Sequence, residues 1–266
     1  MRGYVLTIEE PGGRRRSGIA AELADVPFPW EFVEGLRKGD PALDELYSPV
    51  RNLLYSKRSL APGEVACYAG HRLIWERIVN GPDPYAIVFE DDASIVDRPA
   101  FEQALEDITS HDFDLVKMFD FKPKAVAVEK QVGKTTLVVH KMIASSTACY
   151  VISRDAARRM LARRFIYRAV DEDFSHAWEF GVGIWSVWPN PAYDGGTEGS
   201  NIELQRNRTR KNRLRSIHGA LLQMGKQHRQ RLYLRKARAA VLSRLFETPK
   251  TPGIHDPLAR LSTLEK

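Results

Sequence analysis

The sequence predicts an α/β layered domain followed by a basic helical segment. Short apolar runs of strand type alternate along the chain with segments in which apolar residues recur at helical spacing. One run, residues 85–89, is apolar throughout and bounded by turn residues, which is typical of a strand buried in the middle of a sheet. The basic segment is evident from its charge, because residues 206–245 contain 13 Lys and Arg but neither Asp nor Glu.

The strands are expected where apolar residues form short runs: residues 4–8, 30–33, 85–89, 114–119, 135–140, 148–152 and 184–188. The first run is followed by the turn signal Pro11-Gly12-Gly13. Weak alternation over residues 135–140 predicts an edge strand. Residues 184–188 are expected to form the last strand of the domain, followed by a loop over residues 189–201.

The helices are expected where apolar residues recur every three or four positions: residues 14–23, 41–55, 63–80, 101–108 and 154–162. The helix over residues 63–80 stops at Asn80-Gly81-Pro82, and Ser153 is the predicted N-cap of the helix over 154–162. Aliphatic residues among the bases of residues 212–245 predict a basic amphipathic helix or helix pair. They are Leu214, Ile217, Leu221, Leu232, Leu242 and Leu245.

The composition is that of an ordinary globular protein. The chain has 266 residues, 43% of them hydrophobic and 28% charged. It lacks an apolar run long enough to span a membrane, and its first residues lack the apolar stretch of a secretory signal. Its two cysteines, Cys67 and Cys149, cannot make a disulfide framework or a four-ligand zinc site, and both are expected in the core. We therefore expect a cytoplasmic protein and exclude collagen, coiled-coil, disulfide-rich and polytopic membrane classes.

The net charge of +6 is unevenly distributed. Residues 1–205 carry 24 basic and 31 acidic residues, so we expect a mildly acidic domain there and a basic helical extension over residues 206–266. Such an extension is expected to meet a polyanion, either anionic lipid at a membrane surface or nucleic acid. The plain alternative is a solvated helix packed on the acidic domain. No nucleic-acid recognition motif accompanies the bases, which favours the membrane.

The most informative feature is the acidic triplet Glu90-Asp91-Asp92, which directly follows the apolar run. Three adjacent carboxylates repel one another unless a cation is present, and ligands of open α/β sheets bind at the carboxyl ends of strands. Mg²⁺ and Mn²⁺ prefer carboxylate oxygens and commonly bridge to phosphates. In an extended segment Glu90 and Asp92 share a face, so they are the better pair of metal ligands. The alternative is a solvated acidic turn.

Several segments resemble glycosyltransferase family 25, the lipopolysaccharide-biosynthesis galactosyltransferases. The resemblance runs in order through residues 4–202 and does not cover the basic extension. The matching segments are Val5-Leu-Thr-Ile8 with Arg14-Arg15, residues 63–75 around His71-Arg72, Ala86-Ile-Val-Phe-Glu90-Asp91-Asp92-Ala93, residues 147–156, Ala169-Val170-Asp171 and Ser200-Asn201-Ile202. The chain departs from the family pattern at four positions: Thr7 replaces Asn, Gly13 an acidic residue, Ala66 Gly, and Gly70 Ser.

The resemblance implies a GT-A type fold, a Rossmann-like α/β sandwich that binds a nucleotide-sugar at strand ends. It also implies transfer of a sugar, often galactose from UDP-galactose, with inversion at the anomeric carbon. The acceptor would be a lipopolysaccharide or related glycan, and the cofactor Mn²⁺ or Mg²⁺. An enzyme of this kind would act in the cytoplasm, with the basic extension holding it to the inner face of the membrane near a lipid-linked acceptor.

An inverting transfer needs a neutralised diphosphate leaving group and a base for the acceptor hydroxyl. Asp92, helped by Glu90, is expected to hold the metal, and Asp91 to support the donor sugar or orient the loop. Asp171 matches the family's Asp and is the expected base. Its neighbours Glu172 and Asp173 are rivals for that role, and the alternative for Asp171 is the N-cap of a helix expected around residues 173–180.

The expected donor-binding residues lie near the ends of the first strand and on the helix before the acidic triplet: Thr7, Ile8, Arg14, Arg15, His71, Arg72 and Glu90. The two arginines could instead form an exposed first turn, and a lone helical histidine is often structural. Tryptophan could also form a sugar-stacking platform, although core packing is expected for two of the three candidates. The candidates are Trp178, and the two core residues Trp185 and Trp188.

Two other function classes remain open. A non-catalytic protein of the same fold would bind a nucleotide-sugar or glycan without turnover, and the departures at Thr7 and Gly70 would suit it. A nucleic-acid-binding protein would depend on the basic extension and show a steep salt dependence. A phosphotransferase is disfavoured because the chain has no glycine-rich phosphate loop.

Overall fold

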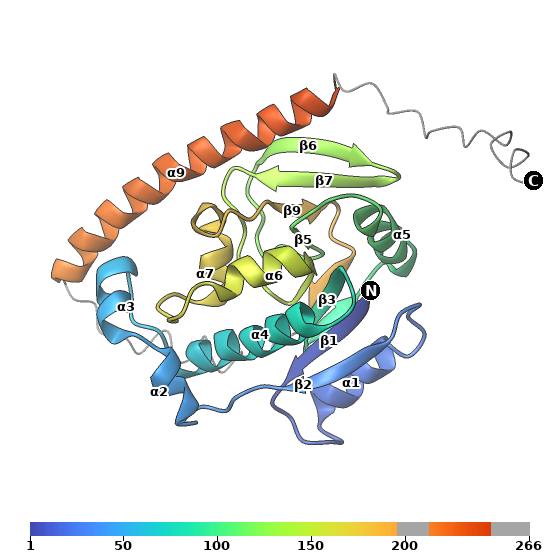
Figure 1. The fold of residues 1–266 in the computed structure, drawn as a ribbon, viewed down its shortest axis with the longest axis horizontal. Helices are drawn as coiled ribbons and strands as arrows, with labels where there is room; N and C mark the ends of the chain where they lie inside the picture. Colours follow the sequence, from blue (N-terminus) through green and yellow to red (C-terminus); the bar gives the residue numbers. More distant parts are fainter. Residues whose placement is uncertain (196–212, 246–266) are drawn as a thin grey trace, which may run out of the picture.

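The computed structural model describes residues 1–195 and 213–245. Its centre is an eight-stranded mixed sheet in the order β2-β1-β3-β8-β5-β9-β7-β6 (Figure 1). The strands are β1 (Arg2–Thr7), β2 (Trp30–Glu34), β3 (Tyr85–Glu90), β5 (Leu115–Lys117), β6 (Val126–Val132), β7 (Thr135–His140), β8 (Cys149–Ser153) and β9 (Ile184–Val187). β1 is parallel to β2 and β3, whereas β8 is antiparallel to β3 and β5. The predicted α/β sandwich with a mixed central sheet is confirmed.

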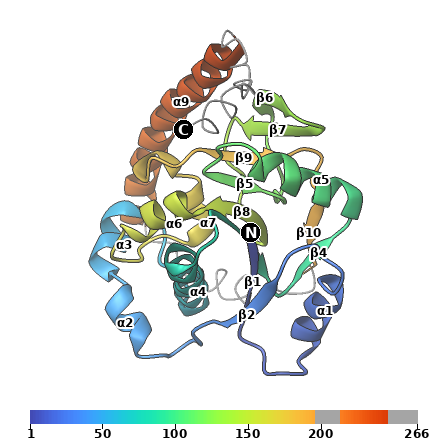
Figure 2. The ribbon, with the colours of Figure 1, turned by 45° about the vertical axis from the view of Figure 1, so that its right-hand side comes forward.

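Helices cover both faces of this sheet (Figure 2). They are α1 (Arg14–Glu22), α2 (Ala42–Leu46), α3 (Pro49–Tyr55), α4 (Pro62–Asn80), α5 (Arg98–Thr109), α6 (Arg154–Leu161), α7 (Val170–Phe174), the 3-10 turn η1 (Ala177–Glu179) and α9 (Arg213–Leu245). Two apolar clusters result, one between the sheet and α4, α6 and α7, the other between the sheet and α1 and α5. In β3, Ala86 and Val88 enter the first cluster and Ile87 and Phe89 the second, which explains the unbroken apolar run.

Most predicted elements form, with Ser153 as N-cap of α6, where its side chain accepts from the backbone N–H of Ala156. The predicted helix over residues 41–55 is two short helices, because the backbone at Tyr47 and Ser48 is extended. The strand expected over residues 114–119 is shorter and covers Leu115–Lys117.

Two strand predictions are wrong. β7 is not an edge strand, because β6 pairs with its outer side. β6 contains Glu129 and Lys130, and its exposed face is polar, so the apolar pattern conceals it. β9 is not the last strand either, because β10 (Ala192–Asp194) follows and pairs with β4 (Ala93–Ile95). This two-stranded sheet lies directly after the acidic triplet.

The basic extension contains one long helix, α9, which packs against β6 and η1. The Tyr233 hydroxyl accepts from the backbone N–H of Ile184 at 2.6 Å, and Lys226 donates to Ser175 at 2.5 Å. The face toward the domain is therefore partly polar. Leu221, Leu232 and Leu242 are exposed instead of packed on the domain. Side chains of Leu214, Ile217 and Leu245 lie outside the described residues, as does the Ser200-Asn201-Ile202 segment.

None of the helices within the described ranges has the length and hydropathy needed to cross a membrane.

Candidate functional site

The acidic triplet lies where β3 ends, beside the end of β1. Glu90 is the last residue of β3 and is paired in register with Leu6, while Asp91 and Asp92 form the turn into β4. Because β1 and β3 are parallel, Thr7 and the triplet share the carboxyl edge of the sheet. The apolar residues of β3 are buried on both faces, so the first polar residues of the segment emerge at this edge.

Asp91 is held by the neighbouring strand. The Thr7 hydroxyl donates to Asp91 Oδ2 at 2.7 Å, and Arg15 Nη1 lies 3.4 Å from Oδ1. Burial raises the pKa of Asp91 above its ordinary value, although the hydrogen bond from Thr7 and the charge of Arg15 oppose the shift. Asp91 is therefore tied to β1 and α1 rather than free for a reacting group.

Asp92 occupies an environment that favours a cation. Burial, followed by the charges of Glu90 and Asp194, raises the pKa of Asp92 to about 7, against the opposing charge of Arg15. Arg15 Nη1 lies 3.3 Å from Asp92 Oδ2, but Asp92 Oδ1 is buried and has no hydrogen-bond partner. A buried carboxylate oxygen without a partner is costly. The donor set of hard oxygens fits Mg²⁺ or Mn²⁺.

Glu90 is positioned by a buried polar chain. The Thr147 hydroxyl donates to Glu90 Oε1, and His71 Nε2 lies 3.4 Å from the same atom. His71 Nδ1 lies 2.9 Å from the Tyr150 hydroxyl. Burial alone would raise the pKa of Glu90, but the hydrogen bonds from His71 and Thr147 lower it below its ordinary value. Glu90 is thus kept ionised and oriented.

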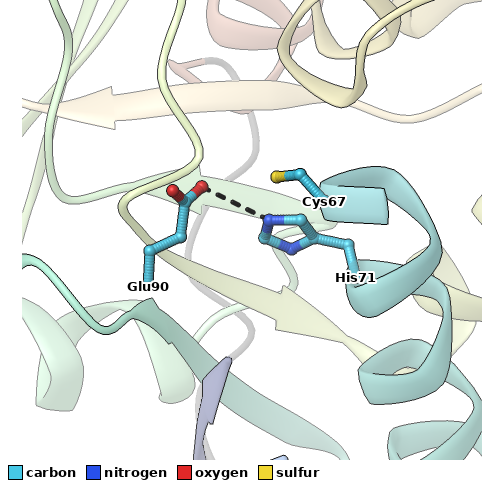
Figure 3. Close-up of side chains that lie close together, drawn as sticks. All are labelled: Cys67, His71 and Glu90. Carbon is cyan, nitrogen blue, oxygen red and sulfur yellow. Dashed lines mark hydrogen bonds and ion pairs between the residues drawn. The ribbon is translucent and has the colours of Figure 1, made fainter. Parts of the chain in front are cut away.

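The hydrogen-bonded chain behind Glu90 extends to Trp75, whose indole N–H donates to the Tyr150 hydroxyl at 3.0 Å. Figure 3 shows Cys67 and His71 of α4 and Glu90 of β3 converging. One potential ligand atom from each lies within 4.8 Å of the others. His71 is completely buried, so it supports Glu90 from behind.

The three acids of α7 have different surroundings. Asp173 is fully buried, pairs with Arg163 and Arg168, and accepts from Tyr68 at 2.8 Å. Its pairing with two arginines identifies it as a structural residue. Asp171 and Glu172 therefore remain as the candidates for the base.

Burial raises the pKa of Glu172, while the charges of Lys226 and Lys57 oppose the rise. Asp171 lies in the first turn of α7, and Ala169 occupies the N-cap position, so the N-cap alternative for Asp171 is wrong. Burial and then the charges of Glu90, Asp171 and Asp92 raise the pKa of the Cys67 thiol. The charge of Asp171 thus acts on the same thiol as the charges of the strand-end acids, and α7 packs against α4, the helix that carries Cys67.

The predicted donor-binding residues are only partly brought together. Arg15 reaches the triplet, whereas Arg14 is exposed and the adjacent Arg16 pairs with Glu34. Ile8 is exposed just beyond β1. Arg72 donates to the Arg163 carbonyl and so is directed toward the segment after α6.

The tryptophans do not form one platform. Trp185 stacks edge-on with Phe113, at 6.2 Å between ring centroids, consistent with packing. Trp188 is 40% exposed and therefore is not a core residue, contrary to expectation. Trp178 contacts His176 and Tyr233 of α9.

Sequence reasoning missed Thr147, Tyr150 and Asp194 as parts of the site. Thr147 and Tyr150 lie far from the triplet along the chain, and Asp194 belongs to the unpredicted strand β10. A threonine just before a predicted strand was the available signal for Thr147, but such residues are common. Cys67 was expected only as a core residue.

Comparison with known proteins gives a consistent family. The model of glycosyltransferase family 25 (LPS biosynthesis protein) matches residues 4–173. Lipooligosaccharide biosynthesis protein lic2B of Haemophilus influenzae is 26% identical over 170 residues, which cover 60% of this chain and 62% of that protein. A probable inactive glycosyltransferase 25 family member 3 of Rattus norvegicus is 31% identical over 145 residues, 52% of this chain and 24% of that protein.

Among solved structures, a Drosophila β-1,4-galactosyltransferase 7 mutant in complex with manganese, UDP-Gal and xylobiose aligns with a TM-score of 0.40 and 7% identity. The alignment covers 82% of this chain and 79% of that one. The chain spans less than two thirds of the length of either curated relative.

Proposed function

The chain belongs to glycosyltransferase family 25, the LPS-biosynthesis family, and on that premise we propose that it transfers galactose from UDP-galactose to a glycan of the lipopolysaccharide class, with inversion. The observation that carries the proposal is the buried, unpartnered Oδ1 of Asp92 beside Glu90 and Asp194. Three neighbouring carboxylates, one of which has a buried oxygen without a hydrogen-bond partner, are the ligands expected of a site that binds a donor through a metal ion. Residues 1–205 would form the catalytic domain and residues 206–266 an extension.

Asp92 and Glu90 would hold Mn²⁺ or Mg²⁺. When bound, the ion supplies Lewis-acid stabilisation of the negative charge on the departing diphosphate. The buried chain from Trp75 through Tyr150 and His71 fixes Glu90 in its ionised form for this task. Arg15, already within ion-pair distance of Asp91 and Asp92, would turn to the donor diphosphate.

Asp171 would act as the base. It accepts the proton of the acceptor hydroxyl as that oxygen forms a bond to the anomeric carbon, and the bond from this carbon to UDP breaks on the opposite side. UDP leaves with the bonding electron pair. Asp173 is committed to Arg163 and Arg168, and of the two remaining acids, Asp171 and Glu172, Asp171 is the one that matches the Asp of the family pattern. Ile8 would contact the donor at the end of β1, while the buried Thr7 holds Asp91, which would orient the loop.

The test is a transfer assay with UDP-galactose and truncated lipooligosaccharide acceptors, with Mn²⁺ or with a chelator. We expect sugar incorporation only with metal, a product of inverted anomeric configuration by NMR, and loss of transfer in Asp171→Asn. A retained configuration, or full transfer in chelator, would overturn the mechanism.

The alternative function is non-catalytic binding of a nucleotide-sugar or glycan. It is favoured by one observation, the similarity to a relative whose name describes it as probably inactive. This alternative predicts that UDP-sugars bind with metal but that UDP is never released, with any acceptor tested.

We further propose that α9 meets an anionic membrane surface on the cytoplasmic side. Leu221, Met224, Leu232 and Leu242 are 62%, 67%, 44% and 56% exposed, and their spacing places them on one side of the helix. Residues 213–245 contain bases but no acids. Exposed apolar residues flanked by bases are typical of helices that lie in the membrane interface.

A further inference from the structure

A basic cavity of about 510 Å³ separates α9 from the segment after β7. Apart from bases, its lining comprises three apolar side chains and three glutamines. The lining residues are Lys141, Met142, Ile143, Gln223, Lys226, Gln227, Gln230, Arg231, Leu234, Arg235 and Arg238. The cavity lies outside the acidic site, since none of its lining residues belongs to that site.

The lining is strongly cationic. It includes five Lys or Arg residues and no Asp or Glu. Among the described parts of the chain, Lys141, Arg231 and Arg235 form no ion pair, and Arg238 donates only to the Ala127 carbonyl. Like charges gathered around one space repel one another, and an anion placed there would relieve the repulsion.

Gln230 provides an independent observation. It is only 5% exposed, lines the cavity, and its Nε2 has no hydrogen-bond partner. Polar atoms buried to this degree are almost always hydrogen-bonded, because leaving one unpaired costs roughly 1–3 kcal/mol. An amide N–H donates and does not accept, so the missing partner is an acceptor oxygen. An oxyanion among five cations supplies one.

We propose that this cavity binds a phosphate or diphosphate group borne by a larger ligand. Phosphate oxygens match the arginine guanidinium groups and the Gln230 amide, while Met142, Ile143 and Leu234 pack against an apolar or saccharide portion. Two sources offer this chemistry: the headgroup of a membrane lipid, and a phosphate on a free glycan. The site is separate from the donor chemistry proposed above and does not depend on it.

The cavity lies beside the residue that follows α7. Lys226, which lines it, donates to Ser175 directly after α7, and its pKa is lowered by burial against the opposing charges of Glu172 and Asp171. A ligand held by its phosphate there would place its remaining part next to α7. Figure 2 shows α9 and α7 on the same side of the sheet.

The test uses the full chain in metal-free buffer, titrated with inorganic pyrophosphate and followed by calorimetry. The double variant Arg231→Gln/Arg235→Gln is compared with Arg229→Gln/Lys236→Gln, which removes the same charge from exposed positions of the same helix outside the cavity. We expect saturable binding to one site, weakened at least about tenfold by the first pair and less than about twofold by the second.

Gln230→Leu is the third variant. It removes the buried amide, so it is expected to weaken pyrophosphate binding without lowering the melting temperature. Equal weakening by both charge pairs would show nonspecific electrostatic attraction and overturn the proposal. The absence of saturable binding would also overturn it. So would a result in which Gln230→Leu and the Arg231→Gln/Arg235→Gln variant, each tested separately, both keep the wild-type affinity.

The source of the phosphate is decided by vesicles. Wild type and the same variants are sedimented with phosphatidylcholine vesicles containing phosphatidylglycerol, with and without pyrophosphate. If the phosphate belongs to a lipid headgroup, the wild-type protein should sediment with the vesicles and pyrophosphate should release it. Arg231→Gln/Arg235→Gln should then lose vesicle binding, whereas Arg229→Gln/Lys236→Gln should keep it. A phosphate on a free glycan predicts pyrophosphate binding with vesicle binding unaffected by the cavity pair.

Discussion

The Thr7 hydroxyl lies 2.7 Å from Oδ2 of Asp91, joining the ends of two parallel neighbouring strands. Thr7 is 2% exposed, so this hydrogen bond is shielded from solvent. The same hydroxyl accepts from the backbone N–H of Glu9 at 3.0 Å. One small side chain therefore fixes both the turn after β1 and the middle acid of the triplet, at a position where the family pattern has asparagine.

Replacing Thr7 by Val is expected to raise the KM for the nucleotide-sugar about tenfold and to destabilise the protein by roughly 1–2 kcal/mol, because Asp91 loses its buried donor. Thr7→Ser keeps the hydroxyl and should retain most of the affinity. Donor titrations and thermal unfolding of both variants measure these effects. If Val and Ser behave alike, the hydrogen bond does not position Asp91.

Substitutions of Asp171 and Asp173 in α7 are expected to have different effects, one on activity and the other on stability. Asp173→Asn should destabilise the protein by roughly 3–5 kcal/mol, because Arg163 and Arg168 lose their fully buried counter-charge and keep only the pairing with Glu179. Asp171→Asn should leave the melting temperature within about 2 °C but reduce kcat at least about a hundredfold. Circular dichroism and steady-state kinetics on the two variants provide the comparison. Full activity in Asp171→Asn would transfer the role of base to Glu172.

The stability of the metal-free protein is expected to fall as the pH rises from about 4 to about 7. The pKa of Asp92 is raised from its ordinary 3.8 to about 7, first by burial and then by Glu90 and Asp194. Between these two pH values the folded state binds one proton more than the unfolded state. The free energy of unfolding therefore decreases as the pH rises, until Asp92 is ionised in both states. Melting temperatures across this range, in chelator, measure the effect.

In Asp92→Asn this pH dependence should be reduced, so that near pH 8 the variant melts several degrees above the metal-free wild type. Near pH 4 the two should coincide. A wild-type protein whose stability rises through the same window would show that Asp92 does not titrate in this way.

Gly70 is expected to resist substitution because Leu6 occupies the space of its missing side chain. A Cβ at Gly70 would lie 2.6 Å from Leu6 Cδ1 and 2.9 Å from Cδ2. Gly70→Ser should therefore destabilise the protein by roughly 1–3 kcal/mol. Combining it with Leu6→Ala should cost less than the sum of the two single changes, as a double-mutant cycle by urea unfolding would report. Simple additivity would mean that the backbone moves instead.

The sequence predicts the centre of the fold well because β3 is buried on both faces. Its apolar run and the carboxylates that follow mark both a central strand and the edge of the sheet. β6 is missed for the opposite reason, since Glu129 and Gln131 occupy its exposed face and Lys130 interrupts the face that carries Val128 and Val132. In α9 the spacing of leucines predicts the helix, but an amphipathic pattern does not say which face meets the domain. Leu221 and Leu232 are exposed, while Gln230 is buried.

The acidic residues of the candidate site can be predicted from the sequence, but the residues that hydrogen-bond to them cannot. Glu90, Asp91 and Asp92 are adjacent in sequence, whereas Thr147 lies 57 residues from Glu90 and Tyr150 lies 79 from His71. Spacing along one chain carries no information about such contacts. The separation of Asp171 from Asp173 likewise depends on Arg163 and Arg168, whose pairing is tertiary.

The most direct test of the metal-dependent donor site is the thermal shift produced by UDP-galactose in wild type and Asp92→Asn, with Mn²⁺ and with chelator. Ligands that bind only the folded state raise the melting temperature. We predict a shift in wild type that requires Mn²⁺, accompanied by slow UDP release, and neither effect in a folded Asp92→Asn. An equal shift in both proteins, or in chelator, would contradict the assignment of the acidic triplet as the donor site.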